Sequence, residues 1–125
     1  MMFLRGVLLS SLLLACAPSH AAPVDRVRAL LYRADGEALV ARLHPDAARE
    51  NADAAARFAR QAGERVAGDP LLRPGGRALE RAAENLRSAA REREDASVRD
   101  AAIEVAVRVR ELDALLPAPP IARSW

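Results

Sequence analysis

Few side chains in this sequence have the chemistry of catalysis or metal binding, and they are not grouped. His44 is the only histidine outside the first 21 residues, and Pro45 follows it directly. As a functional group it would be a lone base or a lone metal ligand, whereas a zinc site needs several His, Cys or carboxylate ligands together. We therefore interpret His44 as a structural side chain at the junction between two helices.

The only cysteine of the chain, Cys16, follows the run Leu13-Leu14-Ala15. This pattern is similar to a bacterial lipoprotein signal, in which the cysteine becomes the lipid-carrying N-terminus. A single cysteine cannot form an intramolecular disulfide. Whether Cys16 is removed with a leader or carries a lipid, we expect neither cysteine catalysis nor thiolate metal ligation.

The sequence lacks the motifs that hold cofactors in helical bundles. A di-iron centre needs a Glu-x-x-His pair on each of two helices, and covalent haem needs Cys-x-x-Cys-His. Neither pattern occurs, and Gly75-Gly76 is not followed by the Lys-Ser/Thr of a phosphate loop. Ser88, Ser97 and Ser124 have no neighbouring base in the sequence. The sequence therefore predicts no cofactor, no metal site and no enzymatic activity.

Charged side chains of both signs alternate along the chain. Lys and Arg total 19, Asp and Glu total 17, and every basic residue is an arginine. A nucleic-acid-binding surface would be basic on one side and usually carries stacking aromatic residues. Glu92, Glu94 and Asp95 instead interleave with Arg91 and Arg93, which is typical of a solvated, ion-paired face. We expect no nucleic-acid partner.

The Pro-rich segment 117–125 is a candidate for contact with a partner, because it ends in Arg123, Ser124 and Trp125. Proline favours an extended, polyproline-like course, and Trp is enriched at binding hot spots. The prediction is a protein contact through Arg123 and Trp125. The alternatives are a disordered tail and a Trp125 that folds back onto the helices.

The first 21 residues have the layout of a secretory signal peptide. Arg5 precedes an uncharged apolar run from Gly6 to Ala15, and Ser19-His20-Ala21 supplies small residues where a signal peptidase reads. The run is shorter than the about 20 residues that a membrane-spanning helix needs. We predict cleavage after Ala21 and a periplasmic or secreted protein. The alternative is a lipoprotein signal of residues 1–15, with lipidated Cys16 as the only attachment to a cell-envelope membrane.

Residues 22–116 are predicted to form one all-α domain. Amphipathic stretches cover 24–43, 45–67, 77–94 and 98–116, and the prolines and glycines of 69–76 predict a loop. In each stretch apolar side chains recur at steps of three and four residues. These side chains are Val24, Val27, Leu31, Ala34, Ala38, Ala41, Ala48, Ala52, Ala55, Ala59, Ala62, Val66, Leu79, Ala83, Leu86, Ala90, Val98, Ala102, Val105, Val109, Leu112 and Leu116. The pattern predicts a small antiparallel bundle of three or four helices after the cleaved signal peptide.

Three local patterns leave alternatives open. Asp35-Gly36 either kinks the first helix or forms a hairpin turn. Residues 103–109 alternate with the period of a strand, although the helical period extends over more of the segment. The third and fourth stretches form either one long helix or two helices with a turn near Asp95–Ser97. In the second case Ser97, with Asp100 three residues later, resembles a capping box.

These patterns together predict an exported, non-catalytic binding or scaffolding protein of the bacterial cell envelope. Its partner would be another protein or a second copy of the chain. Ala52, Ala55 and Ala59 are the candidate residues for close helix packing, within the chain or between copies. The alternative function is a periplasmic small-ligand carrier or a helical-bundle enzyme, with a pocket near the specialised side chains Tyr32, His44 and Phe58.

Overall fold

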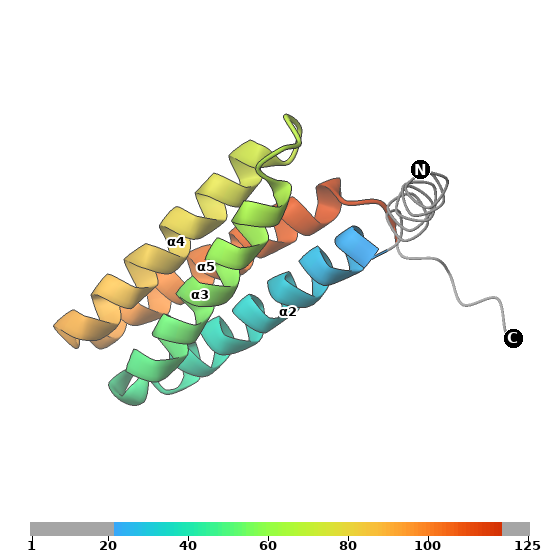
Figure 1. Ribbon diagram of the computed structural model, residues 1–125. Helices are drawn as coiled ribbons and strands as arrows, with labels where there is room; N and C mark the ends of the chain where they lie inside the picture. Colours follow the sequence, from blue (N-terminus) through green and yellow to red (C-terminus); the bar gives the residue numbers. More distant parts are fainter. Residues whose placement is uncertain (1–21, 119–125) are drawn as a thin grey trace, which may run out of the picture.

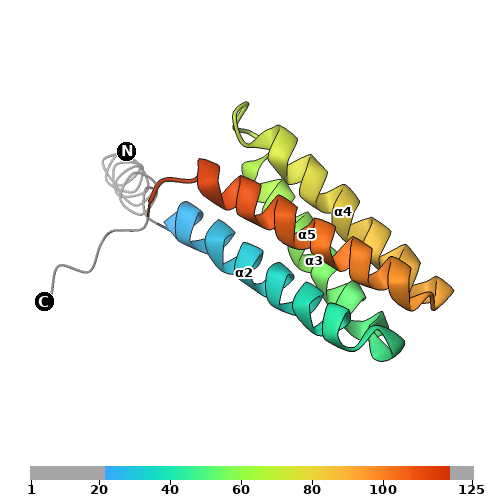
Figure 2. The same cartoon turned by 180° about the vertical axis from the view of Figure 1, so that it is seen from behind.

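Four helices, packed side by side, form nearly all of residues 22–118, the part of the chain that the computed structural model describes (Figure 1). They are α2 (Ala22–Leu43), α3 (Arg49–Val66), α4 (Arg73–Glu92) and α5 (Asp95–Leu115), with the short 3₁₀ helix η1 (Pro45–Ala47) between α2 and α3. Short connections make successive helices antiparallel, and α2 and α5 lie side by side to close the bundle (Figure 2). No strand occurs within 22–118. The predicted all-α bundle is thus confirmed, with four helices; the predicted signal peptide lies outside the described residues.

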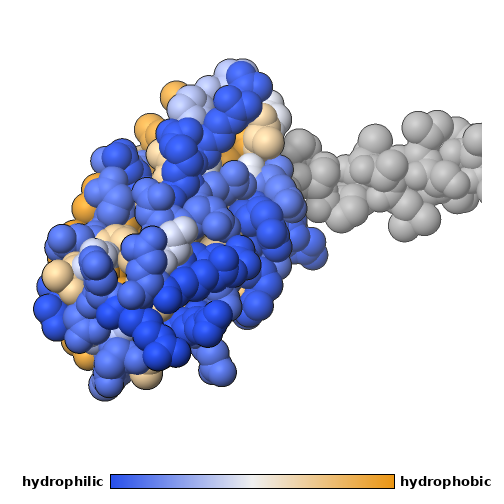
Figure 3. All heavy atoms as spheres, turned by 90° about the vertical axis from the view of Figure 1, so that its left-hand side faces the viewer, coloured by the Kyte–Doolittle hydropathy of each residue, from blue (hydrophilic) through white to orange (hydrophobic). Residues whose placement is uncertain are grey.

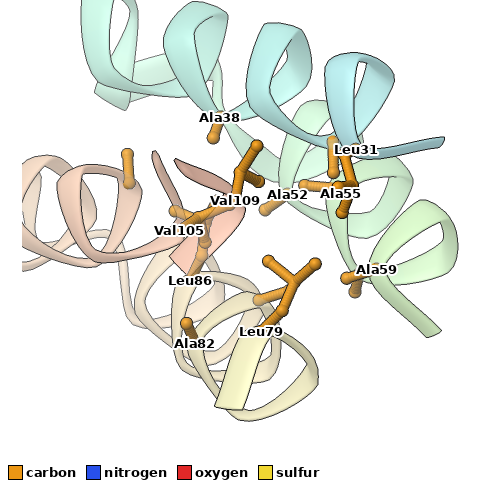
Figure 4. Close-up of a cluster of buried hydrophobic side chains, with 14 of the residues drawn as sticks. Leu31, Ala38, Ala52, Ala55, Ala59, Leu79, Ala82, Leu86, Val105 and Val109 are labelled. Carbon is orange, nitrogen blue, oxygen red and sulfur yellow. The ribbon is translucent and has the colours of Figure 1, made fainter. Parts of the chain in front are cut away.

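The core is built from the inward stripes that the sequence predicts (Figure 4). Every predicted inward residue from Val27 to Leu116 is buried, and Val24 is half-buried. The largest fully buried side chains are Leu31, Leu79, Leu86, Leu112, Val98 and Val105. Alanine occupies most of the remaining core positions, so the helices approach one another closely. Within the described residues, the buried apolar side chains lie between Val27 and Leu116, within the four helices and their connections.

Both segments with competing patterns are helical. The helix α2 runs through Asp35-Gly36 without interruption, and residues 103–109 lie inside α5. In each case the longer helical period determines the structure, because it buries a continuous apolar stripe against neighbouring helices. Pro45 begins the 3₁₀ turn η1, and α3 itself begins only at Arg49.

The helix α4 begins at Arg73, four residues before the predicted start at Arg77. Pro74 fits there because the first turn of a helix leaves its N–H groups without intrahelical partners. Gly76 is buried against α3: a Cβ atom there would lie 2.7 Å from Val66 Cγ2 and 3.2 Å from Gly63 Cα. The prediction of a loop through residue 76 was therefore wrong, because glycine here permits close helix packing and does not end the helix.

The break between α4 and α5 lies at Arg93 and Glu94. Arg93 has φ of 59°, in the left-handed region, and its N–H donates to the carbonyl of Ala89. Glu94 is the N-cap residue of α5, and Ser97 Oγ donates to Glu94 Oε2 at 3.0 Å. Two helices are thus confirmed, but the turn precedes the predicted position at Asp95–Ser97. Ser97 lies inside the first turn and does not cap the helix, because α5 already begins at Asp95.

Candidate binding surfaces

Large apolar side chains are exposed mainly on α2 and α5. Those on α2 are Tyr32, Leu39, Val40 and Leu43, and those on α5 are Ile103, Val107 and Leu115. Within 22–118 the only other one is Leu71, in the connection between α3 and α4. The exposed positions of α3 and α4 are polar, charged or small. Figure 3 shows one face of this mainly hydrophilic surface, with apolar residues visible mostly along its left edge and in smaller spots elsewhere.

Leu39 and Ile103, each exposed by two fifths or more, meet at a hollow of about 120 Å³ between α2 and α5. The small side chains of Ala38, Ala102 and Ala106 also line this hollow, as do the charged groups of Asp35, Arg42 and Arg110. An apolar centre with charged groups around it resembles the anatomy of protein interfaces, in which a dry core is surrounded by a polar rim. The hollow is too small for a drug-sized ligand, but it suits one or two side chains of a partner.

Arg28 joins the first turns of α2 to the end of α5. Its Nε donates to Asp113 Oδ1 at 2.9 Å, and its Nη2 donates to the carbonyl oxygen of Pro117 at 2.8 Å. Arg28 is only 8% exposed, and its Nη1 is buried without a hydrogen-bond partner within the described chain. The guanidinium thus donates a hydrogen bond to a carbonyl just after the last turn of α5. Arg28 therefore has a structural role, because it joins α2 to α5 at this end of the bundle.

A second hollow, of about 210 Å³, lies between α2 and α3 and is lined by Arg26, Arg33 and Arg65 together with Ala29 and Leu30. We call it the arginine hollow. No carboxylate lines it, and none of its three arginines forms an ion pair with a residue in the described part of the chain. Three positive charges therefore face solvent around one hollow.

The aromatic ring of Phe58 supports the arginines beside this hollow. The guanidinium carbons of Arg33 and Arg57 lie 5.7 Å and 5.4 Å from the ring centroid. Phe58 is itself half-buried against the core, so the ring is held in place. A cation over an aromatic face is stabilised by about 0.5–1 kcal/mol at an exposed site. These contacts restrain Arg33 at the surface, although they do not neutralise its charge.

Two arginines on α4 and α5 pair with neighbouring carboxylates. Arg87 pairs with Asp53 of α3 and with Glu84, and Arg108 pairs with Glu104 and Glu111. The hydrogen bond to Glu111, followed by the charge of Glu104, raises the pKa of Arg108 above its ordinary value. The arginine hollow differs from the hollow between α2 and α5 because three arginines and no carboxylate line it.

A wider hollow of about 520 Å³ lies at the opposite end of the bundle from the arginine hollow, where η1 meets the end of α4. Its lining carries both signs of charge, with Asp46 and Glu50 beside Arg49 and Arg93. The charges therefore favour neither an anionic nor a cationic ligand.

The structure does not bring together the three side chains that the ligand-carrier hypothesis places at one pocket. Tyr32 is exposed on α2, His44 is exposed between α2 and η1, and Phe58 lies half-buried on α3. None of the three lines the arginine hollow or the hollow between α2 and α5.

Sequence reasoning missed Arg26, Arg33 and Arg65. One available signal was that Arg26 has no carboxylate three or four residues away. Glu37, four residues after Arg33, accepts a hydrogen bond from Asn51 instead.

The other candidate residues fall into two groups. Ala52, Ala55 and Ala59 are fully buried and pack against the other helices of the same chain. A second copy could reach them only if the bundle opened. Cys16, Arg123 and Trp125 lie outside the described residues.

Among residues 22–118 there is no group of three or more His, Cys, Asp or Glu side chains that could hold a metal ion. None of the described helices is both long enough and apolar enough to cross a membrane. The chain matches no protein-family model, and comparisons with curated proteins and with solved structures give no match.

Proposed function

We propose that the chain is an exported, non-catalytic binding or scaffolding protein of the bacterial cell envelope, and that its α2–α5 face binds a protein partner. The observation that carries this proposal is the exposure of Leu39 and Ile103 around one hollow. Full burial of a Leu or Ile side chain is worth about 1.5–3 kcal/mol. Folding leaves Leu39 and Ile103 about half exposed, so a partner that covers both side chains would recover part of this free energy.

The shape and charge of the hollow favour one kind of partner. Two antiparallel helices form a groove, and such grooves accept an amphipathic helix with apolar side chains at i, i+3, i+4 and i+7. Arg42 and Arg110 outnumber Asp35 in the lining. Acidic residues beside the apolar stripe of the partner would therefore be favoured, mainly through faster and more specific association.

Export is proposed from the first 21 residues, and a non-catalytic role from the scarcity of catalytic side chains in the sequence. The first 21 residues have the proportions of a secretory signal, with the lipoprotein signal at Cys16 as the alternative route. His44, the only histidine after residue 21, is exposed at a helix junction and makes no side-chain hydrogen bond to cap the turn that follows. Localisation is thus proposed as periplasmic or secreted, or as lipid-anchored to an envelope membrane.

Photocrosslinking in living cells tests the α2–α5 face. A photoreactive amino acid at Val107, which is exposed on α5, should give a discrete protein adduct. The double variant Leu39→Asp, Ile103→Asp should reduce this adduct at least about tenfold, because each carboxylate would have to be desolvated in the interface. The matched control is Gln61→Asp, Ser88→Asp, which adds the same charge at exposed positions of α3 and α4 and should leave the adduct unchanged. Equal loss in both variants, or no protein adduct at all, would contradict the proposal.

A further inference from the structure

The arginine hollow combines three cations with an apolar wall. Arg26, Arg33 and Arg65 supply guanidinium groups, whose planar N–H forks match the oxygens of a phosphate. Leu30 and Ala29 supply the apolar surface between them. We propose that this hollow binds the phosphate of an anionic phospholipid headgroup at a membrane surface. The inference does not depend on the α2–α5 face, which carries different residues.

The charge distribution indicates that the ligand is an anion. The chain as a whole is nearly neutral, and Arg87 and Arg108 are each paired with two carboxylates. The three arginines of the hollow form no ion pair within residues 22–118, and, unlike the other arginines without one, they line a single hollow that no carboxylate lines. A bound anion, or salt, would lower the repulsion among the three guanidinium groups. Phe58 restrains Arg33 through the cation–π contact, so less side-chain entropy is lost when the anion binds.

The position of the hollow favours a membrane lipid over a free phosphate. Arg26 lies in the second turn of α2 and Arg65 in the last turn of α3, so the hollow lies near the end of the bundle where α2 begins. Leu71, in the connection that leaves α3 at this end, exposes 65% of its surface. If Cys16 carries a lipid, the six residues to Ala22 span at most about 20 Å, which holds this end against the bilayer. Sequence reasoning offered Cys16 as the only membrane contact, and the arginine hollow is a second one.

Vesicle flotation with a leaderless chain tests this inference. A chain that begins at Ala22 keeps every buried core residue and carries neither the apolar leader nor Cys16. It should float with phosphatidylcholine vesicles that contain phosphatidylglycerol, and not with pure phosphatidylcholine vesicles. Each arginine near an anionic surface strengthens binding about fivefold, so the variant Arg26→Gln, Arg33→Gln, Arg65→Gln should bind on the order of 100-fold more weakly. Binding should also fall steeply with added salt.

A second triple variant separates the hollow from net charge. Arg49→Gln, Arg91→Gln, Arg99→Gln removes the same charge from exposed positions at the opposite end of the bundle. It should lose less than about threefold in affinity, because charges away from the membrane contact are screened. Circular dichroism checks that both variants remain helical. If the hollow variant does not fold, the single change Arg26→Gln replaces it, with an expected loss of about fivefold.

Three results would overturn the inference. Equal losses in the two triple variants would show that only net charge matters. Equal flotation with and without phosphatidylglycerol, or no flotation at all, would show that the chain does not bind an anionic headgroup. Inorganic phosphate is the third probe: if it shifts the NMR signals of the three guanidinium groups while anionic vesicles are not bound, the hollow is a site for a free anion and the membrane contact is wrong.

Discussion

The two halves of the bundle bury similar side chains but present different surfaces to solvent. The α3–α4 half covers its inward stripe of Ala, Leu and Val with charged and polar side chains, and Arg87 links the two helices through Asp53. The α2–α5 half buries an equivalent stripe, yet it also exposes seven large apolar side chains. Because the inward stripes suffice to build the core, the outward apolar side chains of α2 and α5 are not explained by folding. This difference is the basis of the proposal that the α2–α5 face binds a partner.

Each half contains one ion pair that joins its two helices, and the two ion pairs differ in burial. The side chains of Arg28 and Asp113, which link α2 to α5, are 10% and 33% exposed, whereas those of Arg87 and Asp53 are 35% and 46% exposed. Exposed ion pairs contribute little, since water and salt screen them. A buried guanidinium is costly to leave without its carboxylate. The α2–α5 half therefore depends on its ion pair more than the α3–α4 half does.

The largest expected effects are common to both halves, because they concern the shared core. Leu31→Ala in α2 and Leu79→Ala in α4 each remove a fully buried side chain and should each lower the free energy of unfolding by about 3 kcal/mol. Urea unfolding followed by far-UV circular dichroism measures this. The exposed Leu39→Ala is the control and should change stability by less than about 0.5 kcal/mol. If Leu39→Ala costs as much as Leu31→Ala, the outward side of α2 is needed for folding and the comparison fails.

A smaller effect should distinguish the two ion pairs. Asp113→Ala leaves the buried Arg28 guanidinium without its carboxylate and should lower the free energy of unfolding by about 2 kcal/mol, less than for a fully buried pair because Asp113 is one-third exposed. Asp53→Ala should cost about 0.5 kcal/mol or less. Adding Arg28→Met to Asp113→Ala should restore part of the loss, since an apolar side chain then fills the site. Equal costs for the two Asp variants would show that burial does not separate the pairs.

The smallest effects should have opposite signs at two helical glycines. A Cβ at Gly36 meets nothing within 4 Å, so Gly36→Ala should raise the free energy of unfolding by about 0.5–1 kcal/mol through better helix propensity. At Gly76 the new Cβ meets Val66 and the backbone of Gly63, so Gly76→Ala should lower it by about 1 kcal/mol. Thermal unfolding of the two variants beside the parent chain measures both changes. Stabilisation by Gly76→Ala would mean that α3 and α4 do not pack this closely.

The helices and their buried faces were predictable because each stripe is a local property. A residue such as Leu86 is inward because its neighbours three and four positions away are apolar, whatever the other helices do. The start of α4 was not predictable in this way. Pro74, Gly75 and Gly76 read as a loop, and only the close approach of α3 explains why Gly76 lies in a helix. Arg93 likewise carries no sequence signal for the left-handed conformation that ends α4.

The candidate surfaces needed the tertiary structure, because their residues are distant in the sequence. Leu39 and Ile103 become neighbours only when α5 packs beside α2, and Arg65 joins Arg26 and Arg33 only through the pairing of α2 with α3. The sequence by itself determined the four apolar stripes, and with them the helices and the core. Which outward side chains gather at the seams between helices was decided by the packing, since a helical stripe fixes what faces inward and not which neighbour lies alongside.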